Sequence, residues 1–187
     1  MISRVSHDLT PWGRRGRIMR LKANQPCGVR TPLAPVARND SLRDGPRRMM
    51  PTFELLEHTA DIGFEARADT PADLFQEAAG AFLFIAVDTA AVLDREGWRV
   101  EVAGDDYPSL LVNFLQELLY LVDTGTFVPC ACEIEAIEPT RLVAGLRGEA
   151  RLAARHPWKL MVKAVTYHGL EVTERGGRWL ARVFLDV

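Results

Sequence analysis

The sequence predicts an α+β fold, mainly antiparallel β-sheet with two main helices packed on one face. Two long segments repeat apolar residues at helical spacing, which is typical of amphipathic helices. Most other segments alternate apolar and polar residues, as half-buried strands do, and after residue 125 the pattern is almost wholly of this kind. Strands and helices that alternate first and are followed by a run of strands favour an α+β domain.

Each helix is marked by a start signal. Thr70 can cap the first helix, and Pro71 after it suits the first helical turn. The apolar positions that follow predict a helix over residues 71–87. Asp106 opens the second helix in a similar way, and Gly125 is a stop signal beyond its end.

The predicted strands share alternating apolar and polar residues and are bounded by turn signals. Gly176 and Gly177 stand together between the last two strands, which predicts a hairpin turn. The strands are expected over residues 53–56, 63–68, 98–102, 127–137, 141–150, 162–167, 169–174 and 178–185.

Charge divides the chain of 187 residues into two parts. Residues 1–50 hold eleven Arg and Lys against three Asp, whereas residues 51–187 hold twelve basic and twenty-two acidic residues. We expect the basic part to be disordered, because it cannot bury enough apolar surface to offset the entropy of ordering. It is either an extension, such as a nucleic-acid-binding arm or a targeting peptide, or a mis-called start before Met49 or Met50. The folded domain is expected over residues 51–187.

Several classes of function lack their sequence signature. No apolar run approaches the ~20 residues that a membrane span needs. The Gly-rich phosphate loop, the nucleophile elbow and the His-Glu-x-x-His zinc motif are absent from the sequence. The acidic domain alone is poorly suited to nucleic acid, because such binding depends on Lys and Arg that neutralise phosphates. Cys130 and Cys132 are expected to be reduced, which fits a cytoplasmic protein.

Two acidic residues far apart in the sequence are the leading candidates for a site. Asp61, three residues after His58, lies at a strand boundary, where its carboxylate either stabilises a turn or faces a cavity. Asp186 ends the last strand, whose apolar residues should be buried and hold it in place. If the two strands are neighbours, the carboxylates converge and repel each other unless they are protonated or bridged by a cation. Oxygen ligands favour Ca²⁺ or Mg²⁺ over zinc, and an oxygen of Val187 could add a ligand.

Three other residues have competing interpretations. Lys163 lies in an otherwise apolar strand, either as an edge charge that discourages aggregation or as a cation aimed at phosphate or carboxylate. His168, before Gly169, either ends a strand or shuttles protons near neutral pH. Asp123 falls at the negative end of the second helix, where the dipole does not stabilise a carboxylate. It is either a site residue or an exposed helix-terminal charge.

Four segments, taken in their order and spacing, carry a resemblance to a known family. They are HTADIGFEARADTPADLFQEAA, LLVNFLQELLYLVDTGTF, VKAVTYHGLEV and WLARVFLDV. Together they resemble the archease family over essentially all of residues 52–187. Residues 1–50 fall outside the resemblance, which favours the late start.

The resemblance implies an accessory protein rather than an enzyme. Archease assists an RtcB-type RNA ligase, which joins RNA ends with GTP and a divalent metal. It promotes guanylylation and repeated turnover of that ligase in tRNA splicing and RNA repair, so that RNA is contacted only indirectly. The implied fold is a small archease-like α+β domain with a calcium site, for which Mg²⁺ or Mn²⁺ are alternative ions. The positions that match are Asp61, Asp186 and Val187 as metal ligands, and Lys163, His58, Asp123 and His168 as partner or functional residues.

Two other functions stay open at this point. A metal-dependent phosphoester hydrolase could use the same carboxylates, and it would lose its activity in Asp61→Ala. A general chaperone or modulator of nucleic-acid-modifying enzymes would not depend on Asp61.

Overall fold

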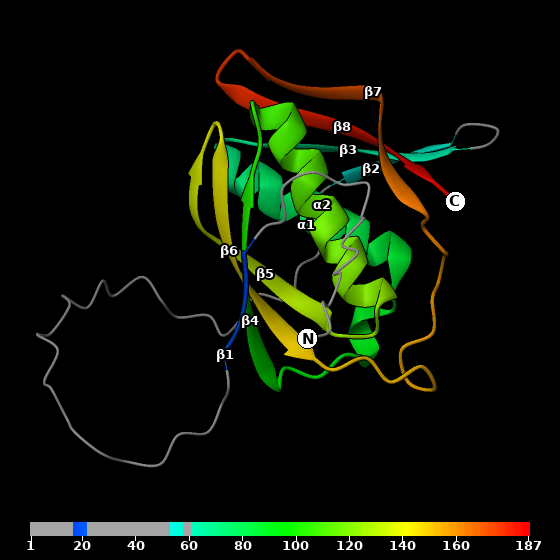
Figure 1. Cartoon of the computed structure of the whole chain (residues 1–187). Coiled ribbons are helices and arrows are strands. Elements are labelled where there is room, and N and C mark those ends of the chain that lie inside the picture. Colours follow the sequence, from blue (N-terminus) through cyan, green and yellow to red (C-terminus); the bar gives the residue numbers. More distant parts are fainter. Residues whose placement is uncertain (1–16, 22–52, 58–60) are drawn as a thin grey trace, which may run out of the picture.

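The strands of this protein form two antiparallel sheets. The structure, a computed structural model, describes residues 17–21, 53–57 and 61–187 (Figure 1). For residues 17–21, Glu57 and Asp61 it describes the backbone only. Sheet A has the strand order β1-β4-β6-β5, and sheet B has the order β2-β3-β8-β7. The predicted α+β class is confirmed, although the strands are divided between two sheets instead of forming one.

The helices and strands have the following bounds in chain order. They are β1 (Arg17–Leu21), β2 (Phe53–Glu57), β3 (Asp61–Ala68), α1 (Pro71–Ala86), the 3-10 helix η1 (Thr89–Ala91), β4 (Glu96–Ala103), α2 (Tyr107–Asp123), β5 (Val128–Glu138), β6 (Arg141–Glu149), β7 (Ala164–Arg175) and β8 (Arg178–Asp186).

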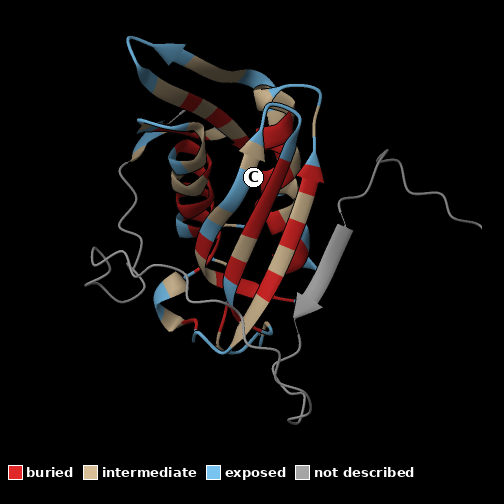
Figure 2. Ribbon diagram, turned by 90° about the vertical axis from the view of Figure 1, so that its left-hand side faces the viewer, coloured by how far each residue is buried: buried red, intermediate tan, exposed pale blue. Residues whose placement is uncertain are grey.

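The two helices lie between the two sheets (Figure 1). α1 packs on β5 of sheet A and on β3 of sheet B, whereas α2 packs mainly on β7 and β4. Both helices are therefore covered on more than one side, and their buried residues are not confined to a narrow stripe (Figure 2). Each sheet keeps its helices on one face, as expected, and leaves its other face outward. The core includes the fully buried rings of Phe64, Phe75, Phe82, Phe114 and Phe127.

Capping residues set the helix ends as the sequence predicts. The Thr70 hydroxyl accepts a hydrogen bond from the Asp73 N–H at 3.1 Å. Asp106 accepts from the Ser109 N–H at 2.8 Å, within a capping box that satisfies two otherwise unpaired groups. Gly125 has a φ of 72° after α2, a left-handed conformation that costs glycine little.

The strands predicted over 162–167 and 169–174 are a single strand, β7, that contains a bulge. Residues 167–170 lie opposite Val183 alone in β8. Gly169 has a φ of 63° within this bulge, so the glycine marks extra residues in a continuing strand, not the end of one. The prediction of two strands is wrong for this reason.

The turn between β7 and β8 is formed by Gly176 and Gly177, whose φ angles are 61° and 78°. Two successive positive φ angles are those of a type I′ turn, which matches the twist of a two-residue hairpin. The predicted hairpin is confirmed.

Within residues 1–50 the structure describes β1, which pairs antiparallel with β4. The disorder or late start predicted for the rest of this segment lies outside the described residues. In the described part of the chain, no helix is long and apolar enough to cross a membrane.

Candidate metal centre

β3 and β8 are neighbours in sheet B, which meets the condition set for Asp61 and Asp186 to converge, and their register pairs Asp61 with Asp186. Paired positions of an antiparallel ladder share one face of the sheet. Leu185 is fully buried against the helices, so the paired acidic positions belong to the outward face. The acidic corner is formed by the start of β3 at Asp61, the end of β8 at Asp186 and Val187, and Lys163 beside them.

The position of Asp186 is fixed by the strand that carries it. β8 is an interior strand of sheet B, with β3 on one side and β7 on the other. Ala181, Val183 and Leu185 are fully buried, and they anchor the strand up to the residue before Asp186. On the β7 side, Ala164 pairs with Asp186. The exposed carboxylate therefore stands on a backbone held from both sides.

Lys163, directly before β7, contacts both of the last two residues. Its N–H donates to the backbone oxygen of Asp186 at 2.8 Å, and its Nζ donates to the backbone oxygen of Val187 at 2.7 Å. β7 is an edge strand of sheet B, which agrees with the edge-charge interpretation. The contact with Val187 favours the interpretation of Lys163 as a cation aimed at phosphate or carboxylate, because an edge charge needs no specific acceptor.

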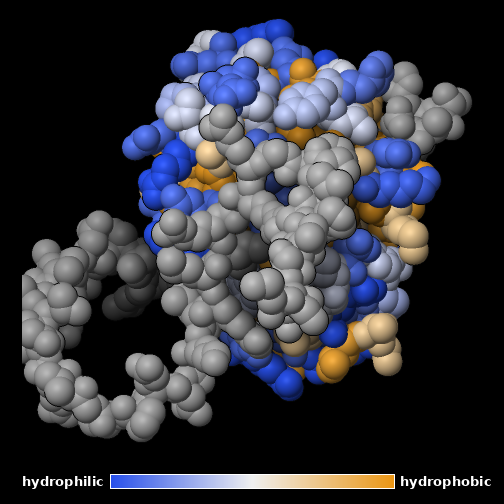
Figure 3. Space-filling view, viewed as in Figure 1, coloured by the Kyte–Doolittle hydropathy of each residue, from blue (hydrophilic) through white to orange (hydrophobic). Residues whose placement is uncertain are grey.

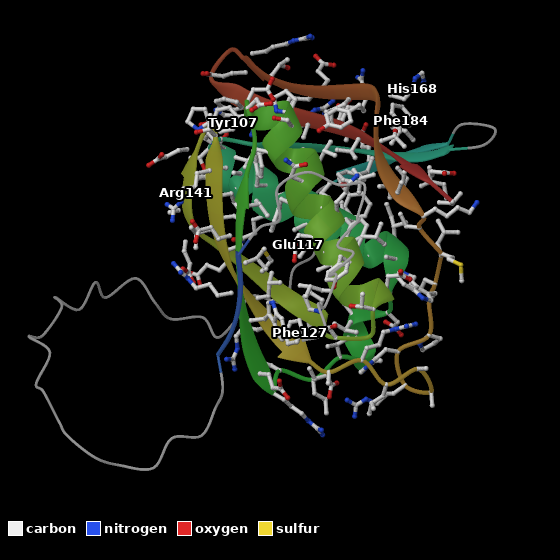
Figure 4. The ribbon with its side chains drawn as sticks, viewed as in Figure 1. Tyr107, Glu117, Phe127, Arg141, His168 and Phe184 are labelled. Atoms are coloured by element: carbon white, nitrogen blue, oxygen red, sulfur yellow. The ribbon has the colours of Figure 1, made fainter. Side chains whose placement is uncertain are left out.

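An aromatic ring beside the acidic corner was missed by sequence reasoning. Phe184 precedes Asp186 by two residues and lies on the same face. A Cβ at Gly63 or at Gly169 would lie 2.8 or 2.7 Å from its ring, so both glycines make room for it. The ring of His168 follows, with its centroid 6.3 Å from that of Phe184 (Figure 4). Glycines inside two strands were the signal, since they often mark a close approach.

The donor atoms available at the acidic corner are oxygens. An Asp at each of the paired positions 61 and 186, with the backbone oxygen of Val187, would offer hard oxygen ligands of the kind that suit Ca²⁺, Mg²⁺ or Mn²⁺. Two like charges in register also call for a compensating positive charge. The chemistry of these residue types is that of a divalent-cation site, and binding of the cation stays a prediction. Among the side chains that the structure describes, no group of three His, Cys, Asp or Glu is placed to hold a metal ion.

The structure does not bring all predicted site residues together. His58 lies outside the described residues. His168 is exposed in the bulge of β7, beside Phe184. Asp123 is exposed at the last residue of α2, and no ion pair joins it to another described residue. The functional roles of these three residues stay predictions.

Farther along the same face, acidic side chains are paired with arginines. Glu65 is only 7% exposed, and it contacts Arg67 and, at 2.8 Å, Arg182. Burial opposes its charge, but the hydrogen bond from Arg182 and the charge of Arg67 outweigh burial and hold the pKa of Glu65 below its ordinary value. Arg182 also lies 3.4 Å from Glu171. This set of Glu65, Arg67, Arg182 and Glu171 is called the charge ladder below. Figure 3 shows hydrophilic residues prevailing over β7 and β8.

A second buried charged group lies on the other sheet. Glu149, at the end of β6, accepts from the Leu93 N–H at 2.7 Å and contacts Arg155. His156 is 1% exposed and lies 3.2 Å from the same carboxylate. Burial opposes ionisation, yet the Leu93 N–H and Arg155 hold the pKa of Glu149 below its ordinary value. These contacts anchor the segment after β6 and leave no open oxygen ligands comparable with those of the acidic corner.

Fold and site together define a small two-sheet α+β protein with an acidic, oxygen-lined corner. The model of the Archease protein family (MTH1598/TM1083) matches residues 53–187. Protein archease of Methanosarcina mazei is 36% identical over 139 residues, covering 72% of this chain and 95% of that protein. Protein archease of Pyrococcus abyssi is 37% identical over 143 residues, covering 74% and 100%. The chain belongs to the archease family.

Solved structures agree with this assignment. The solution structure of Methanobacterium thermoautotrophicum Protein 1598 has a TM-score of 0.65 and 34% sequence identity, and it covers 74% of this chain and 100% of that one. An archease and possible chaperone from Thermotoga maritima has a TM-score of 0.50 at 20% identity, over 71% of this chain and 94% of that one. The second likeness shows the fold alone.

Proposed function

We propose that this protein activates an RtcB-type RNA ligase, promoting its guanylylation and multiple turnover in tRNA splicing and RNA repair by ordering a divalent metal. The observation that carries the proposal is the register that pairs Asp61 with Asp186. Membership of the archease family supports it. The protein acts on another enzyme in the cytoplasm and meets RNA only through that enzyme.

Asp61, Asp186 and the backbone oxygen of Val187 would hold Ca²⁺, with Mg²⁺ or Mn²⁺ as alternatives. When bound, such an ion supplies positive charge close to phosphate groups. Nucleotidyl and phosphoryl transfers depend mainly on positioning and charge stabilisation, so a helper protein needs no nucleophile of its own. The acidic domain suits a basic, RNA-binding partner, because complementary charge speeds encounter and favours the correct partner.

A multiple-turnover ligation assay tests this function. The ligase is supplied at substoichiometric concentration with RNA ends and GTP, with and without this protein, while Ca²⁺, Mg²⁺ or Mn²⁺ is titrated. We expect several products per ligase molecule with the protein present, and loss of this gain in Asp61→Ala and Asp186→Ala. Asp105→Ala is the matched control, because Asp105 is an exposed carboxylate before α2. Full activation by the two corner variants would contradict the proposed site.

The same purified protein separates two other functions. Phosphoester hydrolysis without ligase, abolished in Asp61→Ala, would indicate a metal-dependent hydrolase. The Thermotoga maritima relative is described as a possible chaperone, and a general chaperone would suppress aggregation of unrelated proteins equally well in Asp61→Ala. We expect neither activity to account for the effect on the ligase.

A further inference from the structure

Lys163 occupies an oxygen that the proposed function assigns to the cation. Its Nζ donates to the backbone oxygen of Val187 at 2.7 Å, and its N–H holds the backbone oxygen of Asp186 at 2.8 Å. An ammonium group and a divalent cation repel each other, and both seek the lone pairs of the same oxygen. A divalent cation at the Val187 oxygen would therefore compete with this ammonium contact.

Among the residues that the structure describes, Lys163 is the main source of positive charge at the acidic corner. The described neighbours on the outward face, Phe184 and Thr166, are uncharged. Arg182, the next cation along β8, is engaged with Glu65 and Glu171. Among the described residues, Lys163 is the cation whose side chain contacts the end of β8. Its charge would offset part of the repulsion that is expected between carboxylates at the paired positions 61 and 186.

The side chain of Lys163 is suited to leaving this position. It is exposed, so breaking the contact exchanges an oxygen partner for water at little cost. A lysine ammonium is a compact charge on a flexible four-carbon stem, and it can swing to another anion without moving the backbone. The backbone bond to Asp186 can persist while the side chain moves.

We propose that Lys163 is a displaceable counter-ion of the acidic corner. It binds Val187 in the cation-free protein, leaves when a divalent cation binds, and then presents its ammonium to an anionic group of the partner, of the phosphate class. This inference rests on the proposed function, because it takes the acidic corner as the cation site.

Calorimetric titration of the purified protein with Ca²⁺ alone tests the competition. Lys163→Met removes the charge and keeps much of the stem, so we expect Ca²⁺ to bind roughly three- to tenfold more tightly at low ionic strength. Lys163→Arg retains the charge and should bind within about twofold of the natural protein. The gain in Lys163→Met should shrink as salt is added, because the group is exposed.

Lys159→Met is the matched control. The Nζ of Lys159 also donates to a backbone oxygen, that of Phe84 at 2.8 Å, and the side chain is also exposed. Its removal changes the net charge equally but should leave Ca²⁺ affinity within about twofold. Equal or weaker Ca²⁺ binding by Lys163→Met would overturn the inference while the proposed site stands. Absence of Ca²⁺ binding in all of these proteins would overturn the cation site and this inference with it.

Displacement itself has a separate readout. Lysines dimethylated with ¹³C-formaldehyde keep their charge and report their surroundings by NMR. The methyl signal of Lys163 is identified by its absence from the spectrum of Lys163→Arg. Addition of Ca²⁺ should shift this signal and should leave the signal of Lys159 in place. A Lys163 signal that does not respond to saturating Ca²⁺ would overturn the displacement.

Discussion

The acidic corner and the charge ladder lie on the same face of sheet B, on the same two strands, yet they treat negative charge in opposite ways. In the charge ladder, Glu65 stands opposite Arg182 and is enclosed by arginines. In the acidic corner, four residues earlier in β3, Asp61 stands opposite Asp186. One pairing satisfies its charge within the chain, and the other places like charge against like.

The difference separates a contribution to stability from a contribution to binding. Opposite charges paired across strands stabilise a sheet, whereas like charges directly opposite each other destabilise it. We assign the compensation for the second arrangement to Lys163, which contacts Val187, or to the proposed cation. We therefore expect changes in the acidic corner to alter cation binding, and changes in the charge ladder to alter unfolding.

The largest expected effect is on cation affinity. Asp186→Asn removes one of the two proposed carboxylate ligands, and Ca²⁺ affinity measured by calorimetry should fall by about 100-fold or more. Thermal unfolding without cation should be unchanged or slightly raised, because a repulsive pair is removed. A large loss of stability in this variant would show that the acidic corner is structural.

The next effect concerns the backbone beside the acidic corner. Gly169→Ala combines a positive φ with a Cβ 2.7 Å from the Phe184 ring, and it should lower the free energy of unfolding by about 2 kcal/mol. Gly176→Ala is the control, because its φ is 61° but no atom lies within 4 Å of the added Cβ. It should cost only about 1 kcal/mol. Equal losses in chemical denaturation would mean that the Phe184 ring moves aside freely.

In the charge ladder, Arg182→Met leaves the nearly buried Glu65 with Arg67 alone. Arg182 is 40% exposed, so the loss in unfolding free energy should be modest, about 1 kcal/mol. The pKa of Glu65 is held below its ordinary value of 4.5, so its ionisation contributes stability above that pH. The difference between the two proteins should disappear as pH falls through the lowered pKa. A drop in Ca²⁺ affinity in Arg182→Met would show that the two regions are coupled.

The smallest effect involves a carboxylate in the helix layer, Glu117, which forms no ion pair with any residue that the structure describes. Glu117 lies on α2 (Figure 4), and its Oε1 has no hydrogen-bond partner among the described residues. Burial raises the pKa of Glu117 above its ordinary value of 4.5, so stability is lost as pH rises through the raised pKa. Glu117→Gln should therefore gain up to about 1 kcal/mol at pH 7. The gain should vanish below pH 4.5, and a gain independent of pH would contradict this cause.

Much of this fold was accessible from local sequence signals. Thr70 and Asp106 are helix caps, and the turn at Gly176 and Gly177 is the predicted hairpin. Local signals could not assign strands to two sheets, because alternation in a strand shows that one face is buried but not what covers it. The bulge was missed for a related reason: Gly169 has the same local meaning at a strand end and inside a bulge.

The candidate site was predictable in part. The sequence predicted that Asp61 and Asp186 converge if their strands are neighbours. β3 and β8 are neighbours and meet this condition. The contact between Lys163 and Val187 depends on which strand flanks β8 on its other side, which no local pattern encodes. The same holds for Phe184, whose place depends on glycines in both neighbouring strands.

The bulge at residues 167–170 divides β7 into two lengths whose pairing with β8 is set separately. The hairpin turn sets the register of residues 171–175 with β8. The register of Ala164 and Thr166 is instead set at the far end of β8. Peptide inserted between Gly176 and Gly177 should therefore project from the tip without changing the alignment beside Asp186. That turn is the natural attachment point for an affinity tag or a fluorophore when the protein is to be immobilised or tracked with its binding chemistry intact.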